Sequence, residues 1–208
     1  PGGRPLLRYW TSTPKINNKE AKVLGLKPKR KTHVLTWDEQ IALFNELPPH
    51  LRRMAEFAIN TGCREGDVTG LRWEWLYTDP ETSINYFVIP GEEHKNGEDR
   101  IVVLNDTALK VIGQCRGDHP THVFTYKGKP VKNIYNSAFK NARKRASKRY
   151  PDIAKSHVHS WKHTVGTRLR NQALCPEEDR KDLMGHKSGR TMTEHYSVPE
   201  LTRMHDYV

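Results

Sequence analysis

Apolar residues recur at helical spacing along most of this chain, and one pair of short β-type segments interrupts them. The helical pattern begins at Thr36, which has the spacing of a capping box with Glu39. Residues 84–89 and 100–104 are instead rich in β-branched and aromatic residues, and a polar segment with two glycines separates them. That pattern is typical of a hairpin. The sequence therefore predicts a mainly α fold with one small antiparallel β-sheet, of the α+β class.

The expected elements follow from the same spacing. The first helix has Ile41, Leu43, Phe44 and Leu47 as its apolar residues and ends at Pro48 and Pro49. The remaining expected elements are a helix that ends near residues 61–62, a short helix over 64–71, a helix over 106–115, a strand over 122–126, a long helix over 131–149, and mostly helical structure from 156 onward with breaks near 174–176, 185–189 and 199.

Positive charge is concentrated in two blocks. The formal net charge is +11, but residues 1–32 hold nine Lys and Arg with one acid, and residues 127–149 hold nine more with no acid. The rest of the chain carries a net charge of −6. Such asymmetry predicts a polyanion partner, because each neutralised phosphate releases condensed counterions. Neither block pairs its charge with a broad apolar stripe, which argues against a membrane surface.

Several protein classes are excluded or disfavoured. The longest apolar runs are only a few residues, so we expect no membrane span, and no secretory leader is visible at the start. Cys63, Cys115 and Cys175 are odd in number and far apart, which disfavours a disulfide framework and a cysteine zinc site and suits a reducing cytosol. Because the chain begins without Met, we expect it to be a piece of a longer protein.

Residues 1–33 are polar, contain four prolines and lack a sustained period. They are therefore predicted to be a basic linker or arm, followed by one ordered domain over residues 34–208.

Reactive residue types occur in four places, and each is weak evidence alone. An arginine at a helix start, a lysine in a turn and a tyrosine in a C-terminal helix are usually structural. His159 and His163, at i and i+4, could bind zinc with His157 and His186, but Ser160 stands where a zinc protease has its glutamate. A structural zinc site stays open as a minor alternative.

Four motifs that contain these residues follow one another in an order that favours a functional role for them. TGCREGDVTGLRW (61–73) resembles the first arginine box of the tyrosine recombinase, or phage integrase, family. HKNGEDRIVVL (94–104) is similar to that family's β-hairpin, HSWKHTVGT (159–167) to its second box, and LMGHKSGRTMTEHYS (183–197) to its Leu-Gly-His…Tyr ending. The resemblance covers residues 34–208, and it implies the catalytic-domain fold of DNA breaking-rejoining enzymes, with residues 1–33 leading from a separate core-binding domain.

The resemblance implies a role for each matching residue. Tyr196 would be the nucleophile that attacks a DNA phosphodiester and leaves a 3′-phosphotyrosyl bond. Arg64 would bind two phosphate oxygens through its planar fork, and Lys95 would protonate the leaving 5′-oxygen. No cofactor is implied, neither metal nor nucleotide, because the phosphotyrosyl bond stores the energy for rejoining.

The histidines and the second box complete the implied site. His159 would accept a proton or donate to the transition state, and His186 would donate to a phosphate oxygen. Asp67 matches an acid that orients the site. The family's second arginine falls on Lys162, which keeps the charge but loses the bidentate fork. Losing one transition-state donor costs on the order of 2.7–4 kcal/mol. Three alternatives stay open for Lys162: a tolerated natural variant, an engineered weakening of the site, or a less active member of the family.

Partners follow from the resemblance as well. We expect the protein to bind double-stranded DNA attachment sites and to form a homotetramer on DNA, whose C-terminal segments (residues 201–208) dock on neighbours or on their own domain. We also expect accessory DNA-bending proteins or an excision factor as partners. The expected location is the bacterial cytoplasm, in association with the nucleoid. Residues of the second basic block on the long helix are predicted to contact the DNA backbone: Lys140, Arg143, Lys144, Arg145, Lys148 and Arg149.

The predicted function is a site-specific recombinase domain that integrates or excises a phage or other mobile element. Two alternatives stay open: a recombinase-like module that binds DNA with weakened or lost catalysis because of Lys162, and an activity of the type IB topoisomerase kind.

Overall fold

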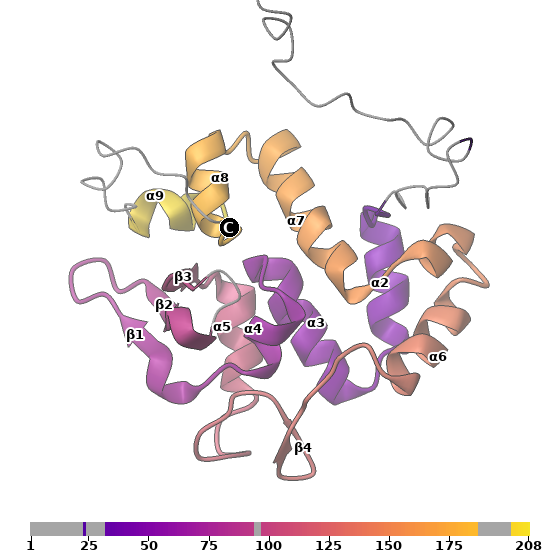
Figure 1. The fold of residues 1–208 in the computed structure, drawn as a ribbon, viewed down its shortest axis with the longest axis horizontal. Coiled ribbons are helices and arrows are strands. Elements are labelled where there is room, and N and C mark those ends of the chain that lie inside the picture. Colours follow the sequence, from indigo (N-terminus) through magenta and orange to yellow (C-terminus); the bar gives the residue numbers. More distant parts are fainter. Residues whose placement is uncertain (1–22, 24–31, 94–96, 187–200) are drawn as a thin grey trace, which may run out of the picture. The chain divides into compact units, whose positions relative to one another are not determined.

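The computed structural model describes residue 23 and residues 32–93, 97–186 and 201–208 (Figure 1). The chain divides into two compact units, residues 1–31 and residues 32–208, and the second unit contains the elements described below. Its helices and strands are α2 (Trp37–Glu46), α3 (Pro49–Thr61), α4 (Glu65–Thr69), β1 (Leu76–Thr78), β2 (Asn85–Ile89), β3 (Arg100–Val103), α5 (Asp106–Gly113), β4 (Thr125–Tyr126), β5 (Lys129–Pro130), α6 (Ser137–Ala146), α7 (Val158–Asn171), α8 (Glu177–Leu183) and α9 (Leu201–Asp206).

The prediction of a mainly α fold with a small antiparallel β-sheet is confirmed. Strands β1, β2 and β3 form an antiparallel sheet in that order, and β2 pairs with β3 as the hairpin pattern predicted. Strands β4 and β5 form a second, two-stranded antiparallel sheet. In the described part of the chain, no helix is both long and apolar enough to cross a membrane.

Local sequence signals explain how the first helices begin and end. Thr36 caps α2 through both halves of the capping box, since its Oγ1 accepts from Glu39 N–H and its own N–H donates to Glu39 Oε2. Helix α3 ends at Gly62, whose φ of +63° is the left-handed conformation that glycine adopts without steric cost. The predicted starts and ends are confirmed here.

Ile41, one of the apolar residues of α2, is 56% exposed. One expectation about the helices was wrong. Helix α6 begins at Ser137 instead of Val131, because the Asn136 side chain caps it by accepting from Phe139 N–H. The preceding backbone is held differently: Glu65 Oε1 accepts from the N–H groups of residues 134 and 135, a long-range contact that no local pattern indicates.

The core packs α3 against α5 and α7, and it fixes the orientation of α7. Trp161 of α7 is fully buried, with its ring edge-on to Phe44 of α2 and Phe139 of α6 at centroid distances of 5.8 Å. Aromatic truncation in a core costs about 3–5 kcal/mol, so this contact strongly favours one rotation of α7. His159 and His163, at other positions on the helix, are exposed.

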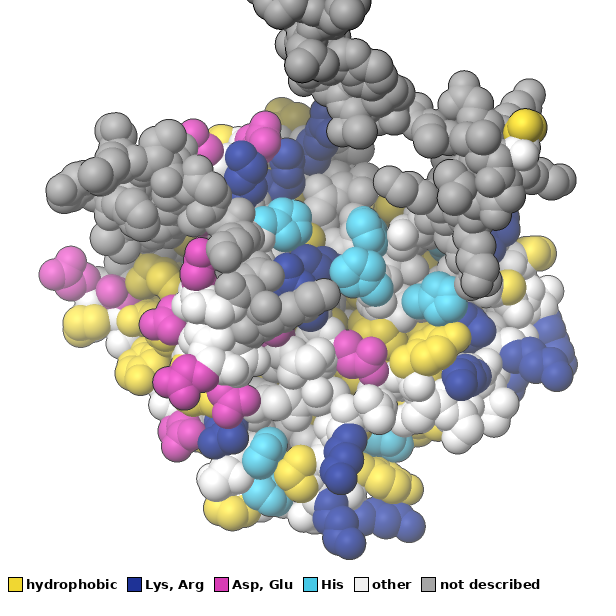
Figure 2. Space-filling model, in the orientation of Figure 1, with side chains coloured by type: hydrophobic (Ala, Val, Ile, Leu, Met, Phe, Trp, Pro, Cys, Tyr) yellow, Lys and Arg dark blue, Asp and Glu magenta, His cyan; other side chains and the backbone are white. Residues whose placement is uncertain are grey.

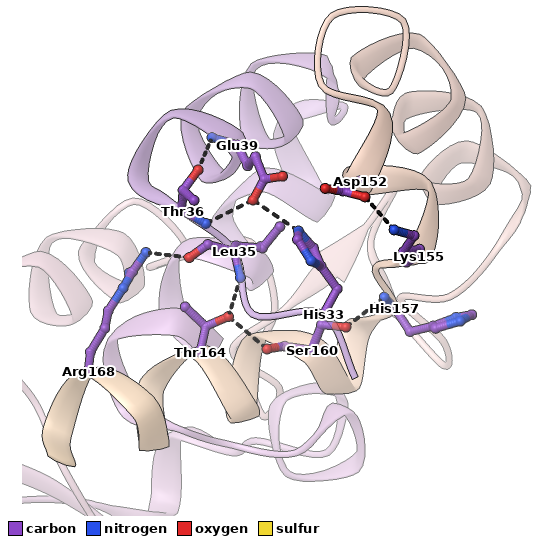
Figure 3. Close-up of polar contacts among 10 residues, drawn as sticks. All are labelled: His33, Leu35, Thr36, Glu39, Asp152, Lys155, His157, Ser160, Thr164 and Arg168. Atoms are coloured by element: carbon purple, nitrogen blue, oxygen red, sulfur yellow. Dashed lines mark hydrogen bonds and ion pairs between the residues drawn. The ribbon is translucent and has the colours of Figure 1, made fainter. Parts of the chain in front are cut away.

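The segment before α2 is also bound to α7 (Figure 3). Leu35 donates its N–H to Thr164 Oγ1 at 3.0 Å, and its carbonyl accepts from Arg168 Nη2 at 3.4 Å. Thr164 in turn donates to Ser160 O at 2.9 Å. Both polar groups of one buried residue are thus satisfied by a single helix, which fixes α7 along its axis as well.

Candidate active site

Three segments bring predicted residues to one cavity of about 580 Å³. Arg64 comes from the start of α4, His159 and Lys162 come from α7, and His186 follows α8. The residues that line the cavity are Arg64, His159, Lys162, His163, Gly166, Thr167, Arg170, Asn171, Arg180, Met184 and His186.

The lining of this cavity is strongly basic. It contains three arginines, one lysine and three histidines, and none of the lining residues is Asp or Glu. A concave site lined by cations focuses a positive potential and concentrates anions. Its chemistry fits a phosphate group, whose oxygens accept hydrogen bonds from guanidinium, ammonium and imidazole donors.

Arg64 is the N-cap residue of α4, so its extended backbone turns the side chain out of the helix. Its Nη1 donates to the carbonyl of Gly185 at 3.2 Å, which joins α4 to the segment that ends in His186. Burial lowers the pKa of Arg64, and the nearby charge of Arg100 acts in the same direction while Asp67 opposes it. The guanidinium is thus held at the cavity by its own backbone and by the α8 end.

Asp67 lies behind the cavity, where it is buried. Its Oδ2 accepts from the backbone N–H of Arg64 at 3.0 Å and from Arg100 Nη1 at 2.5 Å. The carboxylate therefore caps the first turn of α4 and pairs a buried guanidinium. This arrangement fits the orienting role predicted for Asp67.

Lys162 is buried, and its Nζ donates to the carbonyl of Met184. Burial, followed by the charges of Arg100 and Arg64, lowers the pKa of Lys162 from 10.5 to about 7, and Cys63 and Asp67 oppose the shift. Desolvation disfavours the ammonium form, and two like charges add to that effect. At neutral pH the lysine is therefore poised between its charged and neutral forms.

The histidines divide into a pair and a single residue. The rings of His159 and His163 lie edge to face with centroids 4.7 Å apart. Burial lowers the pKa of His186, and the charges of Lys162, Arg64, Arg100 and Arg180 add to the effect. Neutral imidazole is thus the favoured form of His186 near pH 7, able to donate through one nitrogen and accept through the other. Within the described ranges, no group of three or more His, Cys, Asp or Glu could hold a metal ion.

Two predicted catalytic residues, Lys95 and Tyr196, lie outside the described residues. The roles assigned to them from the sequence stay predictions.

The predicted DNA-contacting residues divide into two groups. Arg143 donates to Ser156 O at 2.7 Å, and Arg145 is paired with the Glu46 carboxylate at 2.5 Å. The other four, from α6 and the turn that follows it, are Lys140, Lys144, Lys148 and Arg149, and all four are exposed. The Nζ of Lys140 lies 5.0 Å from the ring centre of Tyr135, and the Cζ of Arg149 lies 5.4 Å from the ring centre of Tyr150.

Sequence reasoning missed three basic residues at or behind the cavity. Arg170 shares a face of α7 with His159, at i+11, and that helical spacing could have identified it. His163, considered from the sequence only as a zinc ligand, lies on the same face at i+4. Arg180 on α8 carried no comparable signal. Arg100 occupies an inward position of β3 together with Val102, so an arginine at a core position of a strand pattern was the available sign.

A known protein family matches most of the chain. The model of the phage integrase family matches residues 33–200. The integrase of Salmonella phage P22 is 31% identical over 108 residues, which cover 50% of this chain and 27% of that integrase. The chain thus spans about a quarter of that relative's length.

Solved structures share the fold at low sequence identity. The Tn1549 transposon integrase in complex with transposon right end DNA matches with a TM-score of 0.60 and 15% identity, over 85% of this chain and 65% of the other. A λ integrase tetramer bound to a Holliday junction matches with a TM-score of 0.54 and 17% identity, over 84% of this chain and 52% of the other.

Proposed function

The chain belongs to the phage integrase family, and on that premise we propose that it is the catalytic domain of a site-specific DNA recombinase. It would cut and rejoin DNA strands through a 3′-phosphotyrosyl intermediate and so integrate or excise a phage or other mobile element. The observation that carries the proposal is the cavity lined by Arg64, His159, Lys162 and His186 without a lining carboxylate.

The proposed reaction is a transesterification at one DNA phosphorus. The phenolic oxygen of Tyr196 forms a bond to phosphorus, the bond to the 5′-oxygen breaks, and Lys95 gives that oxygen a proton. His159 takes the phenol's proton, which a group with a pKa of about 10 does not release readily at neutral pH. Rejoining reverses the same steps, so the bond energy is conserved and no cofactor takes part.

Arg64, Lys162 and His186 would stabilise the charge that develops on the non-bridging oxygens. Preorganised donors in a water-poor site are worth about 2.7–4 kcal/mol each. Arg64 can supply two parallel N–H groups, whereas Lys162 supplies a point charge whose ammonium form is disfavoured by burial. We infer that the present lysine gives a slower enzyme than an arginine would.

DNA would lie across the face that carries the cavity. Figure 2 shows Lys and Arg side chains around β4 at the bottom of this face and over α6 at its right, with histidine side chains over α7. Lys144 and Lys148 are exposed, which suits backbone contacts. Arg145 is hydrogen-bonded to Glu46, and Arg143 donates to the backbone carbonyl of Ser156. We therefore assign Arg143 and Arg145 a structural role rather than a DNA-binding one.

The assembly we propose is a homotetramer on two DNA duplexes, supported by the λ integrase tetramer whose fold is similar. Helix α9 packs on its own domain here: Met204 is 1% exposed, and Arg203 pairs with Asp179 at 2.7 Å. Exchange of this segment between protomers would have to replace those contacts. We further propose that accessory DNA-bending or excision factors assist the tetramer. The proposed location is the bacterial cytoplasm, at the nucleoid.

A covalent trapping experiment tests the reaction. The chain is incubated with a pool of nicked duplexes of randomised sequence, and adducts that survive denaturation are counted and mapped by mass spectrometry. We expect an adduct on Tyr196 that disappears in Tyr196→Phe and persists in the matched control Tyr207→Phe. An adduct that persists in Tyr196→Phe would refute the choice of nucleophile.

A second substrate tests the acid. When a sulfur replaces the bridging 5′-oxygen, the leaving thiolate needs no proton, so the Lys95→Ala variant should regain cleavage on that substrate alone.

The alternative function is a DNA-binding module without catalysis, and the buried, carbonyl-bound Lys162 is the observation that favours it. Absence of an adduct from both the wild type and Lys162→Arg, with DNA binding retained, would establish this alternative. Relaxation of plasmids that lack any attachment site would instead favour a type IB topoisomerase activity.

A further inference from the structure

Arg100 is a buried arginine that does not line the cavity, yet it bonds to segments that do. It begins β3 and is 2% exposed. Its Nη1 pairs with Asp67 of α4 at 2.5 Å, and its Nη2 donates to the carbonyls of Thr61 at 3.3 Å and Leu183 at 3.1 Å. One guanidinium therefore joins the end of α3, the first turn of α4 and the end of α8.

The side chain of Arg100 also lies directly against Gly185. A Cβ at residue 185 would be 2.6 Å from both Cδ and Nε of Arg100, and Gly185 has a φ of +54°. The carbonyl of this same glycine accepts from Arg64 Nη1. Gly185, one residue before His186, thus lies against Arg100 and is hydrogen-bonded to Arg64.

The charge of Arg100 reaches the cavity as well. It contributes to the lowered pKa of three lining groups: Arg64, Lys162 and His186. A buried ion pair is a costly way to fill a core position, since well-packed apolar residues often stabilise as well or better. The geometry therefore points to a role that an apolar side chain would not supply.

We propose that Arg100 is a positioning residue of this site, whose fork fixes the Arg64 helix and the Leu183–Gly185 segment ahead of His186 in one arrangement. The inference rests on the proposed function of the cavity as the site of strand cleavage. Arg100 acts through Asp67 and the two carbonyls, so it places donors at the phosphate without contacting the phosphate itself.

Two variants separate the fork from the charge. Arg100→Lys keeps the charge and loses the planar fork, whereas Arg100→Met loses both. Val102→Ala, a buried position on the same strand, is the control for lost packing. Measurements are the rate of adduct formation at saturating DNA across pH 6–9, and hydrogen exchange of residues 64–69 and 183–186 in the DNA-free protein.

We expect both Arg100 variants to exchange faster than wild type in those two segments and to form adduct about 10- to 100-fold more slowly, because small displacements of catalytic donors are that costly. Arg100→Met should also move the alkaline fall of the rate to higher pH, since Lys162 then keeps its proton longer, whereas Arg100→Lys should leave it in place. Val102→Ala should lower Tm without either change.

Exchange in both segments equal to that of Val102→Ala would overturn the positioning role, whatever the catalytic result. Wild-type protein that forms no adduct, while Arg100→Met exchanges faster, would instead refute the proposed function and leave the positioning role supported.

Discussion

The titration of Lys162 predicts how the stability of the DNA-free protein changes with pH. The perturbation is Lys162→Met, which keeps a long unbranched side chain and removes the charge. The folded state lowers the pKa of Lys162 from 10.5 to about 7 through burial and the charges of Arg100 and Arg64. Between these two values the unfolded chain holds more protons than the folded chain, so the wild type gains stability relative to the variant as the pH rises.

The magnitude follows from the size of the shift. About 3.5 pH units at roughly 1.4 kcal/mol per unit amount to about 5 kcal/mol, which the buried charge costs in full below pH 7. Of this cost, linkage predicts that about 3 kcal/mol is relieved between pH 6.5 and pH 9.5. The lost hydrogen bond to Met184 O costs about 1 kcal/mol at every pH, so it changes the offset between the two proteins but not the slope.

The assay is urea unfolding of both proteins at several pH values, and the quantity is the difference in free energy of unfolding. Other titrating groups cancel in that difference when they do not contact residue 162. Lys148→Met, at an exposed position, is the matched control and should give a flat difference. A difference between wild type and Lys162→Met that is equally flat would refute the assignment of a buried, poised lysine.

Three further outcomes are expected. Lys162→Arg should raise the rate of adduct formation about 10- to 1,000-fold, because arginine restores the planar guanidinium fork. The fall in rate above pH 7 should also disappear, since arginine stays charged. An unchanged rate in single-turnover assays would contradict this expectation. Thr164→Val should lower the free energy of unfolding, measured by chemical denaturation, by about 1–3 kcal/mol, because it leaves the buried N–H of Leu35 without an acceptor. A loss below about 0.5 kcal/mol would show that this N–H finds another partner. Lys144→Ser and Lys148→Ser should each reduce the slope of log affinity against log salt by about 1 in fluorescence anisotropy with duplex DNA; an unchanged slope would remove α6 and the turn after it from the DNA surface.

Much of the fold could be predicted because its signals are local. Thr36 and Glu39 cap α2 within one turn, and Gly62 ends α3 through its own backbone conformation. The Asn136 cap that starts α6 is also a local signal, which the sequence analysis did not use. The backbone ahead of α6 could not be predicted, since it is bound by Glu65, far away in the sequence. Strand β1 was missed because its three residues become a strand only by pairing with β2.

The candidate site could be predicted only in part. Family resemblance indicated Arg64, Lys162 and His186, and the structure brings them to one cavity. Arg100 could not be found in the same way, because its bonds go to Asp67 and to backbone carbonyls that only the tertiary fold brings within reach. The lowered pKa of Lys162 is equally invisible in the sequence, since it arises from burial and from charges on other elements.

The lysine at position 162 therefore differs from an arginine in more than the number of its donors. Arg100 has Asp67 as a buried partner, whereas the Nζ of Lys162 donates to a neutral carbonyl. In the proposed complex the DNA phosphate would be the opposite charge that favours the ammonium form, so phosphate binding above pH 7 would draw a proton onto Lys162. An arginine carries its charge before DNA arrives, and its binding needs no such uptake. In the proposed complex, a lysine at this position would therefore couple phosphate binding to pH, whereas an arginine would not.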